Sequence, residues 1–117
     1  MEFTEVLRRR RMVRAFTPDP LAVDSLAELL AAARRGPSAG RTDAVEFLVL
    51  TGPDTATYWD TTLPPPRRDT FAWPGLLDAP CLVVVVTRPD AYAERYAEPD
   101  KARTGLGDGP EAWPVPY

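Results

Sequence analysis

Apolar residues recur along the chain at two spacings, one typical of helices and the other of strands. The first apolar positions share one helical face and predict a short helix over residues 2–11. A second set, spaced three and four residues apart, predicts a helix that begins near Ala22 and ends at about Arg35. Gly36 stands where a C-cap glycine ends such a helix, and Pro37 prevents its continuation.

Two later segments predict strands, with short helical segments between and after them. Residues 45–50 alternate only in part and predict a largely buried strand, whereas residues 81–87 form a continuous β-branched run. Such a run is typical of a central strand covered on both faces. Short helices are predicted from residue 53 to about residue 59 and over residues 90–98, with a helical turn over 73–78. This order predicts helices packed on a sheet, of α+β or α/β type.

The two evident strands make a poor sheet alone, since stable sheets usually have more members. We therefore expect either a partner chain that completes the sheet or a longer protein of which residues 1–117 are a part.

The 117 residues are enough for a single domain. Fourteen of them are proline, more than twice the usual share of roughly 5%. Residues 61–72 hold a proline cluster and are expected to form a surface loop.

Composition restricts the chemistry that the protein's own side chains can perform. The chain has no histidine, which excludes Ser-His-Asp and Cys-His nucleophile pairs and imidazole metal ligands. Its one cysteine, Cys81, excludes an internal disulfide and cysteine-cluster metal sites. We predict no metal ligand and no catalytic side chain, so an enzyme of this composition would rely on a bound cofactor or on carboxylates.

The net charge of −3 conceals an asymmetry between the two ends of the chain. Residues 1–41 hold eight arginines and five acidic residues, whereas residues 42–117 hold six basic and twelve acidic residues. A local basic patch on an acidic protein argues against nucleic-acid binding, which requires an extended basic face. It suits one small anion better, such as a phosphate.

Membrane and secretory signals are not evident in the sequence. The longest apolar run, residues 81–86, is far shorter than the ~20 residues needed to cross a bilayer. The N-terminus is acidic before it becomes basic, unlike a secretory signal. We expect a cytoplasmic protein with no membrane partner, in keeping with a single unpaired thiol.

Two segments carry the most specific residues. Residues 8–16 place several guanidinium groups around a helix end, where arginine can grip phosphate oxygens bidentately or form a solvated basic face. Residues 36–41, Gly-Pro-Ser-Ala-Gly-Arg, end a helix and expose backbone amides and a hydroxyl, although such a sequence is also a common connector.

In this order the two segments resemble the N-terminal half of the nitroreductase family, the FMN-dependent homodimeric oxidoreductases. Residues 10–16, Arg-Arg-Met-Val-Arg-Ala-Phe, are similar to the family's Arg-Arg-Ser-Val-Arg-x-Phe pattern. Residues 32–40 resemble the helix end and Ala-Pro-Ser-x-x-Asn loop of the family, and residues 46–50 the strand after it. Residues 94–101 and 113–117 look like an actinobacterial branch of it.

The resemblance implies a three-layer α+β fold, with a mixed sheet and helices on both faces, of which this chain encodes a part. It implies an activity in which FMN takes a hydride from NAD(P)H and passes electrons to a small acceptor, such as a nitroaromatic or a quinone. The second half of relatives supplies further strands and flavin contacts. The alternative is a truncated or split, flavin-free subunit with a binding or structural role that needs a partner chain.

The resemblance also assigns cofactor-binding roles to individual residues. Arg10 and Arg11 would hold the FMN phosphate or the pyrimidine edge, and Met12 stands where the family often has serine. Arg14 would face the flavin N1 and C2 carbonyl, where a fixed cation favours the anionic reduced flavin. In the family dimer a loop reaches the flavin held mainly by the other subunit, and here it comprises Pro37, Ser38, Ala39, Gly40 and Arg41. Arg41 replaces the usual asparagine, a departure that could alter substrate choice.

Overall fold

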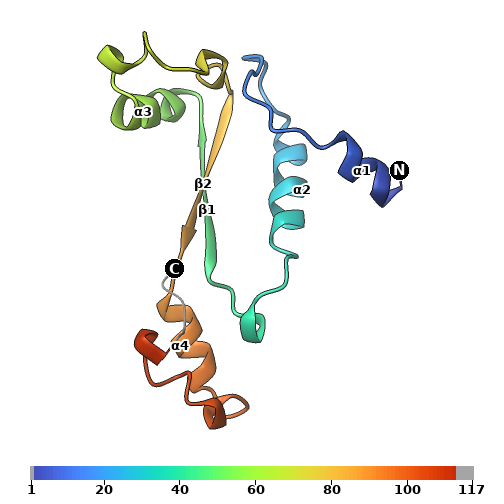
Figure 1. Ribbon diagram of the computed structural model, residues 1–117, viewed down its shortest axis with the longest axis vertical. Coiled ribbons are helices and arrows are strands. Elements are labelled where there is room, and N and C mark those ends of the chain that lie inside the picture. The colour runs from blue at the N-terminus through green and yellow to red at the C-terminus, as the bar shows by residue number, and fades with distance from the viewer. Residues whose placement is uncertain (1, 113–117) are drawn as a thin grey trace. The chain divides into compact units, whose positions relative to one another are not determined.

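The structure is a computed structural model of the chain, and it describes residues 2–112 (Figure 1). Helices and strands both form, so the predicted α+β class is confirmed. The described residues contain helices α1 (Phe3–Arg9), α2 (Val23–Ala33), α3 (Pro53–Thr62) and α4 (Asp90–Ala97), and strands β1 (Val45–Thr51) and β2 (Cys81–Thr87). Short 3₁₀ turns lie at Ala39–Arg41, Pro65–Arg67, Pro74–Leu76, Ala102–Thr104 and Pro110–Ala112.

β1 and β2 pair in an antiparallel, two-stranded sheet (Figure 1). The Arg88 amide donates to the Ala44 carbonyl at 2.8 Å and extends the pairing beyond the start of β1. Both strands were predicted from their apolar runs, and β2 has the predicted bounds.

The predicted burial of the two strands is wrong. β1 was expected to be largely buried, yet its residues alternate between half-buried and exposed, and Leu48 is 54% exposed. β2 was expected to be central, yet Val83, Val85 and Val86 are exposed. The reason is that β1 is the only hydrogen-bonded neighbour of β2 in the described part of the chain, so other faces stay uncovered.

The chain divides into two compact units. Unit 1 consists of the residues up to Pro20 together with Leu50–Leu82. Unit 2 consists of Leu21–Val49 together with the residues from Val83 onward. The two motif segments of the sequence therefore belong to different units, since residues 10–16 lie in unit 1 and residues 36–41 lie in unit 2.

Unit 1 is organised around a row of aromatic side chains. The rings of Tyr58 and Trp59 meet edge to face at 5.2 Å between centroids, and those of Phe71 and Trp73 do so at 6.0 Å. Trp59 and Phe71 join the two pairs at 6.4 Å. Such aromatic contacts add stability beyond the area that they bury. The row ties α3 to the segment before the Pro74–Leu76 turn.

Unit 2 contains α2, the turn at Ala39–Arg41 and α4. The helix predicted to reach about Arg35 ends at Ala33, and the predicted C-cap at Gly36 is wrong, because Arg34 is the C-cap residue. Instead the Arg35 amide bonds to the Ala32 carbonyl at 3.1 Å, so the last turn tightens before Pro37 stops it. Among the described residues no large side chain is fully buried, and in this unit the buried apolar residues are the small Ala44 and Ala91.

The remaining predicted segments agree with the structure in type. α1, α3 and α4 were all expected as short helices, and the Pro74–Leu76 turn falls inside the predicted helical turn. Residues 113–117, which carry part of the family resemblance, lie outside the described residues. No described helix has both the length and the apolar character that crossing a bilayer requires.

Candidate cofactor-binding site

The first motif segment leaves α1 as extended chain. The Arg10 amide still bonds to the Val6 carbonyl at 2.9 Å, but Arg10 itself has ψ 127° and no longer continues the helix. Arg10, Arg11 and Met12 follow one another along this extended stretch and are exposed. Neither arginine has an acidic partner among the described residues, so both guanidinium groups are available to an anion.

Arg14, in the same segment, makes two side-chain contacts. Its guanidinium carbon lies 4.9 Å from the centroid of the Trp73 ring, a cation–π contact. Its Nη2 also donates to the Met12 sulfur at 3.0 Å. Met12, which stands where the family often has serine, therefore contacts Arg14.

The backbone beside Arg14 is fixed by the turn that carries Trp73. The Phe16 amide donates to the Gly75 carbonyl at 3.1 Å. A Cβ at Gly75 would lie 2.9 Å from both the Cα and the Cβ of Ala15, so only glycine allows this close approach. The backbone contact and the ring contact together set the position from which the Arg14 guanidinium extends.

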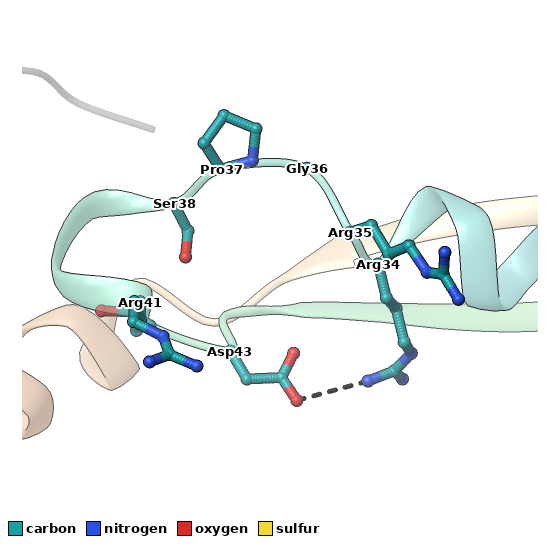
Figure 2. Close-up of a pocket in the computed structure, with 8 residues that line it drawn as sticks. Arg34, Arg35, Gly36, Pro37, Ser38, Arg41 and Asp43 are labelled. Atoms are coloured by element: carbon teal, nitrogen blue, oxygen red, sulfur yellow. Dashed lines mark hydrogen bonds and ion pairs between the residues drawn. The ribbon is translucent and has the colours of Figure 1, made fainter.

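The second motif segment lines a pocket of about 460 Å³ in unit 2 (Figure 2). All of its lining comes from the end of α2 and the loop that leads toward β1. We call it the arginine pocket, and it is lined by Arg34, Arg35, Gly36, Pro37, Ser38, Arg41, Thr42 and Asp43. Three of the predicted residues, Pro37, Ser38 and Arg41, line the pocket, whereas Ala39 and Gly40 form the turn behind it.

The turn has an unusual backbone. Gly40 and Arg41 both have positive φ, at 63° and 58°. Glycine adopts this conformation without cost, but an arginine does not. The Arg41 amide bonds to the Ser38 carbonyl at 3.1 Å, and the buried Thr42 hydroxyl donates to the Ala39 carbonyl at 2.6 Å.

Two arginines that the sequence analysis did not select contribute to the pocket. Arg34 Nη1 lies 3.3 Å from Asp43 Oδ2, and the Arg34 guanidinium also lies 5.6 Å from the Phe47 ring centroid. Arg35 lines the pocket beside it and has no acidic partner in the described chain. The available signal was the pair of arginines directly before Gly36, which the helix pattern had assigned only to a helix end.

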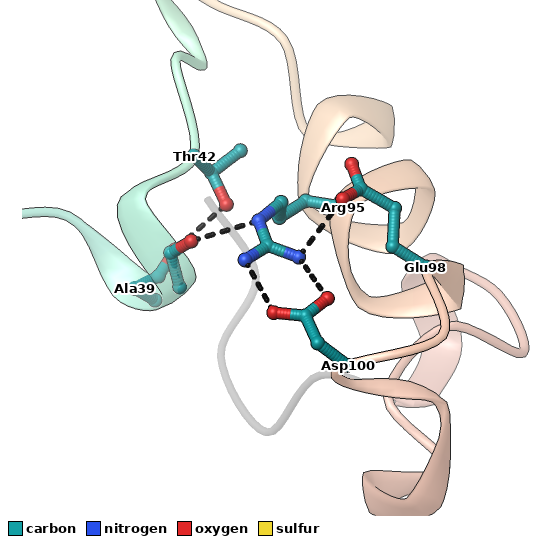
Figure 3. Close-up of polar contacts among 6 residues, drawn as sticks. Ala39, Thr42, Arg95, Glu98 and Asp100 are labelled. Carbon is teal, nitrogen blue, oxygen red and sulfur yellow. Dashed lines mark hydrogen bonds and ion pairs between the residues drawn. The ribbon is translucent and has the colours of Figure 1, made fainter.

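A third missed residue, Arg95 on α4, contacts the same loop (Figure 3). Arg95 Nε donates to the Gly40 carbonyl at 2.9 Å. The other guanidinium nitrogens bind the Asp100 carboxylate bidentately, at 2.8 and 2.9 Å, and Nη1 also contacts Glu98 at 3.1 Å. The hydrogen bonds with Asp100 raise the pKa of Arg95 and lower the pKa of Asp100. Both groups therefore stay charged near neutral pH.

The aromatic ring of Tyr96 completes the support of the loop. A Cβ at Gly40 would lie 2.6 Å from Tyr96 Cε2, so the ring packs directly on the glycine. Gly40 is thus required by its positive φ and by this contact. α4 contacts the turn at Ala39–Arg41 through the hydrogen bond from Arg95 to Gly40 and the ring of Tyr96.

The donor set suits a flavin nucleotide, which carries a phosphate, polar ring edges and an apolar ring. Exposed arginines can bind the phosphate, and an oriented guanidinium can face the polar edge of the ring. Among the described residues no group of three or more Cys, Asp or Glu is placed to hold a metal ion. The exposed arginines of each unit favour an anionic ligand.

Comparison with known proteins gives one match. A family model described as Nitroreductase family matches residues 7–108, a range that includes both motif segments and α4. Searches of curated proteins and of solved structures find no match.

Proposed function

Because the chain belongs to the nitroreductase family of flavin-dependent oxidoreductases, we propose that it binds FMN and uses NAD(P)H to reduce a small acceptor. The acceptor would be a nitroaromatic, a quinone or a similar electron-poor compound. The observation that carries this proposal is that the family match spans both motif segments, whose side chains offer anion-binding and ring-facing groups. When bound, the flavin supplies the hydride chemistry, so the chain needs no histidine.

Arg10 and Arg11 would bind the phosphate of FMN or the pyrimidine edge. They are consecutive, exposed and without acidic partners in the described chain, and arginine pairs bidentately with phosphate oxygens. Replacing both with glutamine should weaken FMN binding much more than riboflavin binding if the phosphate is their target. Arg103→Gln, at an exposed position in unit 2, is the matched control.

Arg14 would place its positive charge beside the N1 and C2 carbonyl of the flavin. The Trp73 ring restrains the guanidinium at 4.9 Å from the ring centroid. A fixed cation there stabilises negative charge that develops on the ring during reduction. Arg14→Gln should lower the flavin reduction potential and slow reduction by NAD(P)H while leaving the fold intact.

The loop at Pro37–Arg41 would contact flavin across a subunit interface. Nitroreductases typically act as dimers, and exposed apolar residues on α1 and β2 leave surface for a second chain to cover. We propose a homodimer in which each loop approaches the flavin of the other protomer. Mixed dimers with Arg14→Gln in one protomer and Gly40→Ala in the other would retain one intact site.

The alternative is a flavin-free subunit that needs a complementary chain. It is favoured by one observation, that no large side chain is fully buried among the described residues. Native mass spectrometry distinguishes the two, since a flavin-loaded homodimer supports the enzyme and a stoichiometric second polypeptide without flavin supports the alternative.

A further inference from the structure

We propose that the arginine pocket binds a phosphate monoester, a group carried by NADPH and FMN but absent from NADH. This inference rests on the proposed function, because it identifies a ligand group for an oxidoreductase that uses such nucleotides. It also narrows the electron donor, which the family alone leaves open.

The net charge of the pocket lining favours a doubly charged anion. The pocket is lined by Arg34, Arg35 and Arg41 and by a single carboxylate, that of Asp43. Asp43 pairs with Arg34, while the other two guanidinium groups have no acidic partner in the described part of the chain. The lining therefore has an excess of two positive charges, which balances the two negative charges of a fully ionised phosphate monoester.

The hydrogen-bond donors of the pocket lie around one space (Figure 2). Arg34 and Arg41 lie on either side of Asp43, and the Ser38 side chain points from the loop into the same space. Guanidinium groups bind phosphate oxygens in forked pairs, and a serine hydroxyl donates to a remaining oxygen. Arg35 is also among the lining residues and adds a positive charge.

The backbone at Arg41 is in the left-handed region. Its φ of 58° places a long side chain in a conformation that glycine and asparagine tolerate far better. The strain is explained if the guanidinium is needed at this place. Arg95 and Tyr96 hold the turn on α4, so the Arg41 side chain starts from a fixed backbone.

Two nucleotides supply the same chemistry. The 5′-phosphate of FMN is already proposed for Arg10 and Arg11, so the 2′-phosphate of NADPH is the expected occupant. NADP⁺ and NAD⁺ differ only in this group, and FMN and riboflavin differ only in the 5′-phosphate. Comparing the affinities within each pair therefore shows which nucleotide supplies the phosphate.

The test measures two affinity ratios in the full chain. Titration calorimetry gives the affinity for NADP⁺ relative to NAD⁺, and flavin fluorescence gives the affinity for FMN relative to riboflavin. We expect NADP⁺ to bind at least about tenfold more tightly than NAD⁺, in line with a charged hydrogen-bonded contact. Arg41→Asn suits the left-handed backbone and removes the charge, so it should bring this ratio close to one. Arg35→Gln should lower it in part, and Arg103→Gln should leave it unchanged.

Each outcome decides the proposal. If the NADP⁺ ratio is unaffected by Arg41→Asn but the preference for FMN over riboflavin falls, the pocket binds the FMN phosphate. If neither ratio responds to the variants, or Arg103→Gln changes them equally, the pocket is not a phosphate site. If neither flavin binds while Arg41-dependent NADP⁺ preference persists, the proposed function fails and the pocket assignment stands.

Discussion

Arg95 Nε donates to the Gly40 carbonyl at 2.9 Å, and this bond connects α4 to the loop that lines the arginine pocket. Arg95→Ala should increase hydrogen exchange of residues 38–42 several-fold and weaken NADP⁺ binding, because the turn loses its support. Arg95→Lys should rescue little, since a lysine cannot serve Gly40 and both Asp100 oxygens with one planar group. Equal exchange in the wild type and both variants would show that the contact does not order the loop.

Asp100 makes this support sensitive to acid. The Arg95 hydrogen bonds lower the pKa of Asp100 below its ordinary value of about 3.9. A group whose folded-state pKa is lowered contributes its full stability above the unfolded pKa, and this is lost as pH falls through the folded pKa. Loop protection should therefore be constant above about pH 5 and decline below about pH 4. Asp100→Asn should show weaker protection and no matching decline, as measured by exchange at several pH values.

Gly40→Ala should destabilise the chain by about 1–3 kcal/mol. The alanine would have to keep a φ of 63° and would bring its Cβ to 2.6 Å from the Tyr96 ring. Gly36→Ala is the matched control in the same loop, because its Cβ would make an ordinary contact of 3.7 Å with the Ala33 carbonyl. Denaturant unfolding measures both, and equal losses would contradict the assigned role of Gly40.

Trp73→Ala should weaken FMN binding about two- to fivefold, the effect expected from losing an exposed cation–π contact of ~0.5–1 kcal/mol. The ring is 47% exposed and restrains the Arg14 guanidinium at 4.9 Å. Trp73→Phe keeps an aromatic face and should retain most of the affinity. Fluorescence titration checks this, and the interpretation fails if phenylalanine and alanine weaken binding equally.

Arg41→Asn should raise the free energy of unfolding by up to ~1 kcal/mol, because asparagine relieves the left-handed strain. The same change should reduce the preference for NADP⁺ over NAD⁺. Stability gained together with lost nucleotide preference would indicate that the strain is retained for binding. A loss of stability would mean that the arginine side chain itself supports the loop.

The spacing of apolar residues predicted the helices and strands well. It did not predict burial or contacts that depend on residues far apart in the sequence. The apolar spacing predicted a helix over residues 2–11, but the structure ends α1 at Arg9. The valine run of β2 predicted a strand correctly, yet its burial depends on neighbouring strands that no local pattern specifies. The Arg95–Gly40 bond joins residues 55 positions apart, so only the folded chain could show it.

The roles of the predicted site residues stay predictions. The family resemblance identified the loop at Pro37–Arg41 and the segment at Arg10–Arg14, and the match over residues 7–108 confirms the family. The pairing of Arg34 with Asp43 was not predicted, because no local pattern brings residues nine positions apart across a loop into contact. Their contact depends on how the chain turns after α2.

The central claim is that this chain is a flavoprotein, and the visible spectrum of the purified full chain tests it most directly. The protein is mixed with FMN, free flavin is removed, and absorbance and melting temperature are recorded beside an Arg10→Gln/Arg11→Gln variant. We predict that the wild type retains the flavin absorbance bands and melts at a higher temperature with FMN, and that the variant retains less. A colourless protein whose melting temperature does not respond to FMN would contradict the claim.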